Sequence, residues 1–238
     1  MMRLDRWLVT IGIGSRTQVQ KLIRQGQVTV NAVRVTDPSH ACGLSEALTV
    51  SGRSVDGRLT RHLMLNKPAG LLTAARDSRQ PTVMNLLPPW CQSLGCMPVG
   101  RLDKDTTGLL LLTTDGELSH RLLSPARHVD KVYLAVVEGS LTQADAAAFA
   151  AGLDLGDFIA APALLELLAP STARVTVHEG KFHQVKRMFE AVGHPVTQLH
   201  RERFGPLSLE DELEEGRWRE LSEEETKALY AAAGMGER

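Results

Sequence analysis

Four consecutive leucines, Leu109–Leu112, are the feature that most restricts how this chain can fold. Gly108 precedes the run, and the turn-forming residues 113–116 follow it. A short apolar run bounded by turn signals, with no polar position, is typical of a strand that is buried on both faces. The sequence therefore predicts a short, fully buried strand over residues 109–112.

A charged loop, residues 100–108, leads directly into this strand. It carries two carboxylates, Asp103 and Asp105, and two cations, Arg101 and Lys104. A loop anchored by a buried strand can hold catalytic groups on a rigid support. The same composition is typical of a turn whose Asp and Thr side chains bond their own backbone. Spacing alone favours the turn and leaves the catalytic interpretation open.

The first residues predict a compact unit of two short helices and a small sheet. The first helix has an apolar stripe, and Ser15 begins the second helix with Gln18 placed for a capping box. Gly26 ends that helix, residues 27–31 alternate like a strand, and residues 51–58 are predicted to be a linker. The apolar stripe consists of Leu4, Trp7, Leu8 and Ile11.

The charge of the chain is unevenly distributed, although its net value is only −1. Residues 1–36 carry six basic side chains against Asp5 alone, whereas residues 207–238 carry ten acidic and four basic ones. Nucleic acid requires a local basic patch, because phosphate attraction is screened within about 10 Å. We therefore expect RNA contacts from the exposed basic residues of the first unit, which include Arg3, Arg6, Arg16, Lys21 and Arg24.

The remainder of the chain predicts mixed α and β structure. Strands are expected over 62–67, 131–137 and 174–178, and helices over 185–192 and 223–233. In the second of these strands the apolar residues at 132, 134 and 136 are expected to face the core, with Tyr133 on the other side. A tyrosine beside a basic residue can stack on a base, but it can also simply fill a sheet face.

Basic and polar side chains also cluster where the helix over 185–192 begins. His183, Gln184, Lys186 and Arg187 lie there, beside an apolar helical stripe. Unpaired N–H groups and the positive end of the helix dipole add to these cations, which favours an anion site. A solvated helix start is the alternative.

The three cysteines are an odd number without zinc-site spacing, so we interpret them as buried or incidental thiols. No run of about 18 apolar residues predicts a membrane span, and the charged N-terminus differs from a signal peptide. A reduced, cytoplasmic location is expected.

Several segments, in order along the chain, resemble the motifs of the RsuA-like family of bacterial ribosomal pseudouridine synthases. These are residues 65–70, 100–116, 131–133, and 179–189 together with 199–203. Residues 3–50 resemble the S-four RNA-binding domain. The resemblance implies an α+β protein. A small N-terminal α/β RNA-binding domain with its linker (1–58) would precede a catalytic domain (59–238) on a mixed, mainly antiparallel sheet with flanking helices.

The resemblance also implies roles for particular residues. Asp103 would be the catalytic aspartate, Tyr133 would lie against a flipped uracil and move a proton, and Lys186 would be the basic partner of Asp103. Arg187, which adjoins Lys186, is the alternative partner. The expected RNA contacts are those of the basic residues of the first unit together with Ser15, Arg101, His183, Gln184, Arg187 and Arg201.

The motifs are closer to those of the small-subunit enzymes, so we expect one uridine of 16S rRNA as the target, with 23S rRNA as the alternative. The partner would be ribosomal RNA, within a small-subunit assembly intermediate, and the protein a monomer. Isomerisation oxidises nothing and consumes no water, so no cofactor or metal is expected. Two other functions stand as alternatives: a non-catalytic RNA-binding assembly factor, and a glycoside or nucleoside hydrolase that pairs Asp103 with Asp105.

Overall fold

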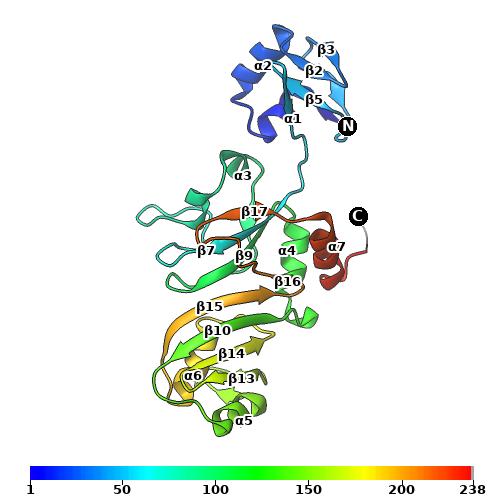
Figure 1. The fold of residues 1–238 in the computed structure, drawn as a ribbon. Helices are drawn as coiled ribbons and strands as arrows, with labels where there is room; N and C mark the ends of the chain where they lie inside the picture. The colour runs from blue at the N-terminus through cyan, green and yellow to red at the C-terminus, as the bar shows by residue number, and fades with distance from the viewer. Residues whose placement is uncertain (237–238) are drawn as a thin grey trace. The chain divides into compact units, whose positions relative to one another are not determined.

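The computed structural model describes residues 1–236, which form two compact units (Figure 1). The first unit comprises Met1–Arg61 and Leu87–Cys96, and the second comprises His62–Leu86 and Met97–Arg238. The short segment 87–96 therefore groups with the first unit, although it is separated from that unit in the sequence. Within residues 1–236, no helix combines the length and the apolar character that crossing a bilayer requires.

The first unit packs two helices against a small sheet with strand order β3-β2-β5-β6. The predicted apolar stripe is confirmed, since Leu4, Trp7, Leu8 and Ile11 are all buried in one core. The capping box of Ser15 and Gln18 is also present. The elements of this unit are β1 (Met2–Arg3), α1 (Leu4–Thr10), α2 (Arg16–Arg24), β2 (Val28–Val30), β3 (Val33–Val35), β4 (Ala41–Cys42), β5 (Leu48–Val50), β6 (Arg53–Val55) and α3 (Pro89–Ser93).

The second unit is built on one sheet with the order β13-β14-β10-β15-β9-β7-β17. The β15–β9 ladder is parallel and the other ladders along this order are antiparallel, so the α+β prediction with a mainly antiparallel sheet is confirmed. The strands are β7 (His62–Lys67), β8 (Met97–Pro98), β9 (Thr107–Thr113), β10 (Lys131–Val137), β13 (Leu164–Ala169), β14 (Thr172–Val177), β15 (Val196–Phe204), β16 (Leu207–Ser208) and β17 (Trp218–Glu220), with the small hairpin β11 (Leu153–Asp154) and β12 (Ile159–Ala160).

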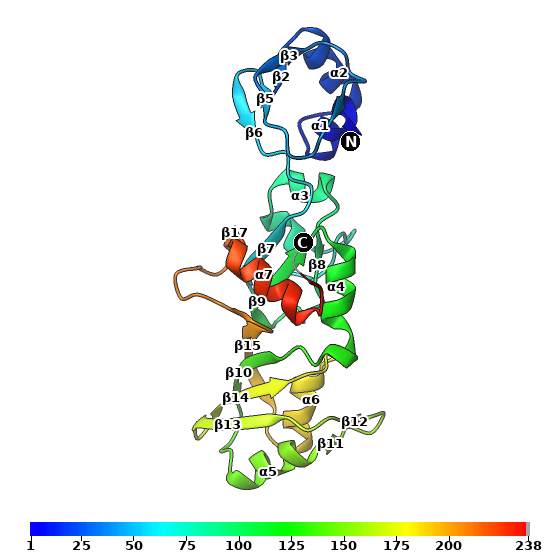
Figure 2. The same ribbon diagram turned by 90° about the vertical axis from the view of Figure 1, so that its right-hand side faces the viewer.

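Two pairs of helices pack on this sheet: α4 (Gly116–Leu123) with α7 (Glu223–Ala232), and α5 (Gln143–Ala151) with α6 (Gln184–Ala191) (Figure 2). Leu118 of α4 and Leu229 of α7 share a core with Leu111 of β9. The sequence predicts α6 and α7, but it does not predict α4 and α5. The turn expected over residues 113–116 leads straight into α4, because Asp115 is the N-cap of that helix and accepts a hydrogen bond from the Leu118 amide at 3.0 Å.

The predicted core face of β10 is wrong for two of its three residues, because Val132 is buried, at 7% exposure, but Leu134 and Val136 are half-buried. Tyr133 and Lys131 lie on the buried face, at 8% and 7% exposure, whereas Leu134 is only half-buried. The reason is that this face packs under α6, so helix packing and not the count of apolar residues decides which side is covered. The three cysteines are buried, in line with the expectation of buried thiols.

Gly108 lies where β9 meets β15, and the close approach of the two backbones requires a glycine. Its φ is +100°, and a Cβ there would lie 2.6 Å from the Arg201 amide nitrogen. Gly108 is paired with Arg201 on one side and with Lys67 on the other. The loop that carries Asp103 is therefore attached to the sheet through a position that tolerates no side chain.

We predict that Gly108→Ala lowers the free energy of unfolding by about 3 kcal/mol or more, because strain at a positive φ adds to the backbone clash. Gly116→Ala is the matched control, since a Cβ at Gly116 would meet no atom within 4 Å and the φ of this residue is not positive. Urea unfolding of both variants checks this. Equal stability of the two variants would contradict the packing described.

Candidate functional site

The buried ammonium group of Lys67 holds the loop that contains Asp103. Its Nζ donates hydrogen bonds to the carbonyl oxygens of Pro68 at 3.0 Å, Lys104 at 3.2 Å and Thr106 at 2.9 Å. The side chain is fully buried, and this burial lowers the pKa of Lys67 to about 8. One cation at the end of β7 thereby fixes the turn that begins at Pro68 and the two ends of the 104–106 segment.

Thr73 fixes the other end of this loop. Its hydroxyl donates to the Leu102 carbonyl oxygen at 2.8 Å and accepts from the Leu102 amide at 3.2 Å. The amide of Gly70 also donates to the Lys104 carbonyl oxygen at 2.8 Å. The segment after β7 is thus hydrogen-bonded to the loop on both sides of Asp103, which restricts the direction of the carboxylate.

The Asp103 carboxylate faces two side chains from the start of α6. His183 Nε2 lies 3.3 Å from its Oδ1, and Lys186 Nζ lies 3.6 Å from its Oδ2. The same Nζ lies 2.5 Å from Asp105 Oδ1, and this hydrogen bond lowers the pKa of Asp105. Arg187 instead pairs with Asp157. Of the two candidate partners, Lys186 is therefore the one beside Asp103.

A local hydrogen-bond network positions the start of α6. His183 is the N-cap and has a left-handed backbone, with φ +49°. Gln184 is 4% exposed; its Nε2 donates to Glu179 Oε2 at 2.9 Å and its Oε1 accepts from the Lys181 amide at 3.1 Å. The sequence predicts that Gln184 contacts RNA, but its position and partners indicate that it braces the 179–184 loop.

A pocket lies on the face of the sheet that α6 covers, and Asp103 is at its edge. We call it the Tyr133 pocket. Its lining combines Tyr133 and apolar residues with Arg101 and the charged groups around Asp103. The residues that line it are Arg101, Leu102, Asp103, Thr106, Tyr133, Val177, Glu179, Gly180, Lys181, His183, Gln184, Val185, Lys186 and Leu199. The structure thus brings the three predicted catalytic residues, Asp103, Tyr133 and Lys186, to one pocket.

Arg201 is placed differently from expectation. Its side chain is 2% exposed, its Nε donates to the Leu109 carbonyl oxygen at 2.8 Å, and its guanidinium carbon lies 5.9 Å from the centre of the Tyr133 ring. A side chain this deeply buried cannot reach a phosphate at the surface. We therefore interpret Arg201 as a support beneath Tyr133 and correct the expectation that it contacts RNA.

The expected RNA-binding residues of the first unit are mostly exposed. Arg3 pairs with buried Asp5 at 3.0 Å, and Arg16 lies 3.9 Å from the same carboxylate. Arg6, Lys21 and Arg24 are exposed as well. The Ser15 hydroxyl caps α2, so its oxygen already accepts a hydrogen bond from the protein.

Sequence reasoning missed the buried lysines of the site, because lysine is rarely buried completely. Lys67 lies in a segment that resembles a family motif, but nothing in the sequence indicates its burial. Lys131 is similar: its Nζ donates to the carbonyl oxygens of Val129 at 2.7 Å and His178 at 3.0 Å, and burial lowers its pKa to about 8.

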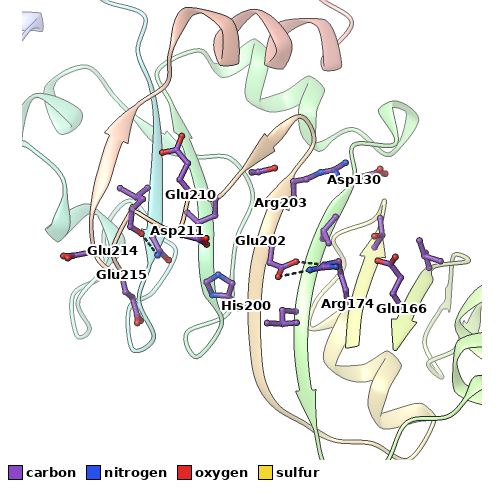
Figure 3. Close-up of a pocket in the computed structure, with 18 residues that line it drawn as sticks. Asp130, Glu166, Arg174, His200, Glu202, Arg203, Glu210, Asp211, Glu214 and Glu215 are labelled. Carbon is purple, nitrogen blue, oxygen red and sulfur yellow. Dashed lines mark hydrogen bonds and ion pairs between the residues drawn. The ribbon is translucent and has the colours of Figure 1, made fainter. Parts of the chain in front are cut away.

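A second, larger hollow lies on the opposite face of the sheet (Figure 3). Seven carboxylates line it, against only two arginines, Arg174 and Arg203. His200 adds little charge, because burial lowers its pKa. A surface of this composition repels phosphate, so a polyanionic ligand is favoured on the face of the Tyr133 pocket. The seven acids are Asp130, Glu166, Glu202, Glu210, Asp211, Glu214 and Glu215.

Comparison with known proteins gives consistent matches. Residues 61–191 match the RNA pseudouridylate synthase family, and residues 2–47 match the S4 domain. A ribosomal small subunit pseudouridine synthase A of Pseudomonas aeruginosa is 42% identical, over 94% of this chain and 98% of that protein. The protein of the same name from Escherichia coli is 39% identical, over 96% and 100%. A crystal structure of a pseudouridylate synthase superposes with a TM-score of 0.68 and 34% identity, over 96% of this chain and 100% of that one.

The buried ammonium of Lys67 makes stability depend on pH. Its folded pKa of about 8 lies below the ordinary 10.5, so the unfolded chain binds more protons between these values, and the free energy of unfolding rises with pH in this window. We predict that wild type gains about 3 kcal/mol over Lys67→Met between pH 8 and 10.5.

Urea unfolding across that pH range measures this effect. Lys104→Met is the control, because the exposed Lys104 ammonium donates to the Gln80 side chain, at 2.8 Å, and to no other group of residues 1–236. Parallel stability curves for wild type and Lys67→Met would show that the ammonium is not held as described.

Proposed function

The chain belongs to the RNA pseudouridylate synthase family, and we propose that it isomerises one uridine of small-subunit ribosomal RNA with Asp103 as the catalytic carboxylate. One observation supports this assignment above the others. The Asp103 carboxylate lies between His183 and Lys186, at the edge of a pocket that contains Tyr133.

We assign RNA capture to residues 1–58 and chemistry to residues 59–238. The cations exposed on the first unit attract phosphates without reading sequence. The S4 match over residues 2–47 supports this role. In the second unit, the acidic hollow on one face of the sheet disfavours RNA there, which leaves the face of the Tyr133 pocket for the substrate.

The reaction breaks the bond between ribose C1′ and N1 of the base and forms a bond between C1′ and C5. The C5 proton is lost and N1 gains one, so no net oxidation occurs and no water is consumed. The uridine must first leave its stack, which costs a few kcal/mol. Asp103 then attacks C1′, assists the loss of the base, or attacks C6. Each route requires Asp103 as an anion, and the Lys186 ammonium orients that anion.

Tyr133 would lie against the flipped uracil and pass the departing proton, directly or through water. Its ring is almost completely buried, between Arg201 beneath it and the pocket in front. Val177, Val185 and Leu199 supply apolar walls that exclude water from the reacting base. The buried guanidinium of Arg201 would keep the ring in this position.

The proposed target is a single uridine of 16S rRNA, because the relatives from Pseudomonas aeruginosa and Escherichia coli are named small-subunit enzymes. We propose a partly assembled small subunit as the natural substrate, since one modified position demands a partly folded target. The protein would act as a monomer in the cytoplasm, where ribosomal RNA is made.

The geometry gives no support to a hydrolase that pairs Asp103 with Asp105. Both carboxylates contact the same Lys186 ammonium, and Asp105 is 75% exposed and does not line the Tyr133 pocket. A purely RNA-binding factor would not need a carboxylate fixed by Lys67, Thr73 and Lys186.

We predict that Asp103→Asn abolishes pseudouridine formation while folding and RNA binding stay unchanged, because the substitution keeps the size of the side chain and removes its charge. Asp105→Asn is the matched control and should retain at least about a tenth of the activity, since Asp105 lies outside the pocket. The assay is tritium release from RNA that carries tritium at uridine C5. Full turnover by Asp103→Asn would exclude the assignment.

Lys186→Met should lower the rate by at least about a hundredfold, because it leaves the catalytic carboxylate without its cation. Arg187→Met should change the rate by less than about tenfold, since Arg187 pairs with Asp157 away from the pocket. Single-turnover rates on the same RNA measure both. A larger loss for Arg187→Met would reverse the assignment of the partner.

A further inference from the structure

Phe182 is a large apolar side chain exposed beside the catalytic carboxylate. It is 66% exposed, in the loop between β14 and α6. Its ring stacks on the His183 ring, with centroids 3.8 Å apart and planes 17° apart. His183 in turn lies 3.3 Å from Asp103. A single exposed phenylalanine needs no explanation in general, but this one extends an aromatic stack that starts at the reacting carboxylate.

The backbone of this loop is held in an uncommon conformation. His183 has φ +49°, in the left-handed region that non-glycine residues seldom adopt. The buried Gln184, bonded to Glu179 and to the Lys181 amide, holds this conformation. Strained backbone that neighbouring bonds enforce is concentrated at functional sites, where it presents a side chain in a required direction.

A third hollow, which we call the Phe182 groove, lies next to the Tyr133 pocket, and Asp103 lines both. The two share Arg101, Asp103 and the 179–181 loop with His183, but only one contains Tyr133 and only the other contains Phe182. The groove is lined by Gly100, Arg101, Asp103, Leu123, Pro125, Lys131, His178, Glu179, Gly180, Lys181, Phe182 and His183.

The charges of the Phe182 groove suit a nucleotide. Arg101 is exposed and supplies a cation, and Lys181 adds a second basic group that lies 3.2 Å from Glu179. Glu179 also accepts hydrogen bonds from the Ala161 amide and the Gln184 side chain, so its charge is occupied by protein donors. An aromatic surface beside cations is the combination that binds an unstacked base and its phosphate. Leu123 and Pro125 add apolar surface to the lining.

We propose that Phe182 stacks on the base of the nucleotide that adjoins the flipped uridine. The inference rests on the proposed function, because the Tyr133 pocket must hold the target uracil for the groove to hold its neighbour. When the target leaves the helix, its neighbour loses a stacking partner, and the Phe182–His183 stack replaces that partner. Every base has a stacking face, so this contact holds the RNA in register and does not by itself select a sequence.

The test compares Phe182→Ala with Phe182→Tyr, which restores the ring, and with Leu168→Ala. Leu168 is the matched control, because it is 49% exposed and lies outside both hollows. The substrate is an in vitro transcript of small-subunit rRNA with tritium at uridine C5. We expect Phe182→Ala to lower kcat/KM by about tenfold. Phe182→Tyr and Leu168→Ala should stay within about twofold of wild type.

A second arm identifies the base involved. Once the modified uridine is mapped, short RNAs that span it are made with an abasic residue on its 5′ or 3′ side. Binding of these RNAs is measured in the Asp103→Asn background, where no chemistry occurs, with and without Phe182→Ala. At one of the two positions, loss of the base should erase the difference in affinity that Phe182→Ala causes, as a double-mutant cycle requires.

The outcomes separate the two proposals. Absence of tritium release by wild type on both the naked transcript and assembled small-subunit particles overturns the proposed function, whereas release by wild type with an unchanged Phe182→Ala overturns the stacking role alone. Wild-type affinity and kcat/KM for Phe182→Ala, an equal loss for Phe182→Tyr, or a difference that persists with both abasic RNAs overturns the stacking role. A defect of Phe182→Ala on assembled small-subunit particles but not on the naked transcript overturns it as well, because it would assign Phe182 to a protein contact.

Discussion

The ammonium group of Lys67 is the interaction on which the geometry of the site depends. Three carbonyl oxygens, from Pro68, Lys104 and Thr106, accept its hydrogen bonds in a place that water does not reach. Carbonyls left without a partner there would be costly, so the charged side chain and the loop fix each other. Gly108 joins this fixed loop to the central strand β9. Its backbone lies too close to that of Arg201 for a side chain to fit.

The site combines this rigid loop with a second element, the start of α6. Asp103 comes from the loop and Lys186 from the helix, so their distance reports how well the two are aligned. The same helix start presents His183 and Phe182 on the other side of the carboxylate. The carboxylate consequently lies between two hollows that share a wall, an arrangement suited to a flipped nucleotide and its neighbour.

Sequence reasoning succeeded where local patterns decide the structure. The bounds of β7 and β10 and the capping box of α2 follow from alternation and cap chemistry, and the structure has them. It failed where tertiary packing decides. Tyr133 was expected on the uncovered face of β10 although α6 buries it, and Arg201 was expected at the surface although it lies beneath that ring. The choice between Lys186 and Arg187 needed the three-dimensional position of Asp157, which adjacency in sequence cannot supply.

The most direct test of the account is the structure of Asp103→Asn bound to its RNA substrate. The account predicts that the target uridine is flipped, with its base against Tyr133 and its C1′ within about 3.5 Å of the side chain at position 103. A uridine that remains stacked in the RNA, or that binds away from the Tyr133 pocket, would contradict the assignment of Asp103 as the catalytic residue.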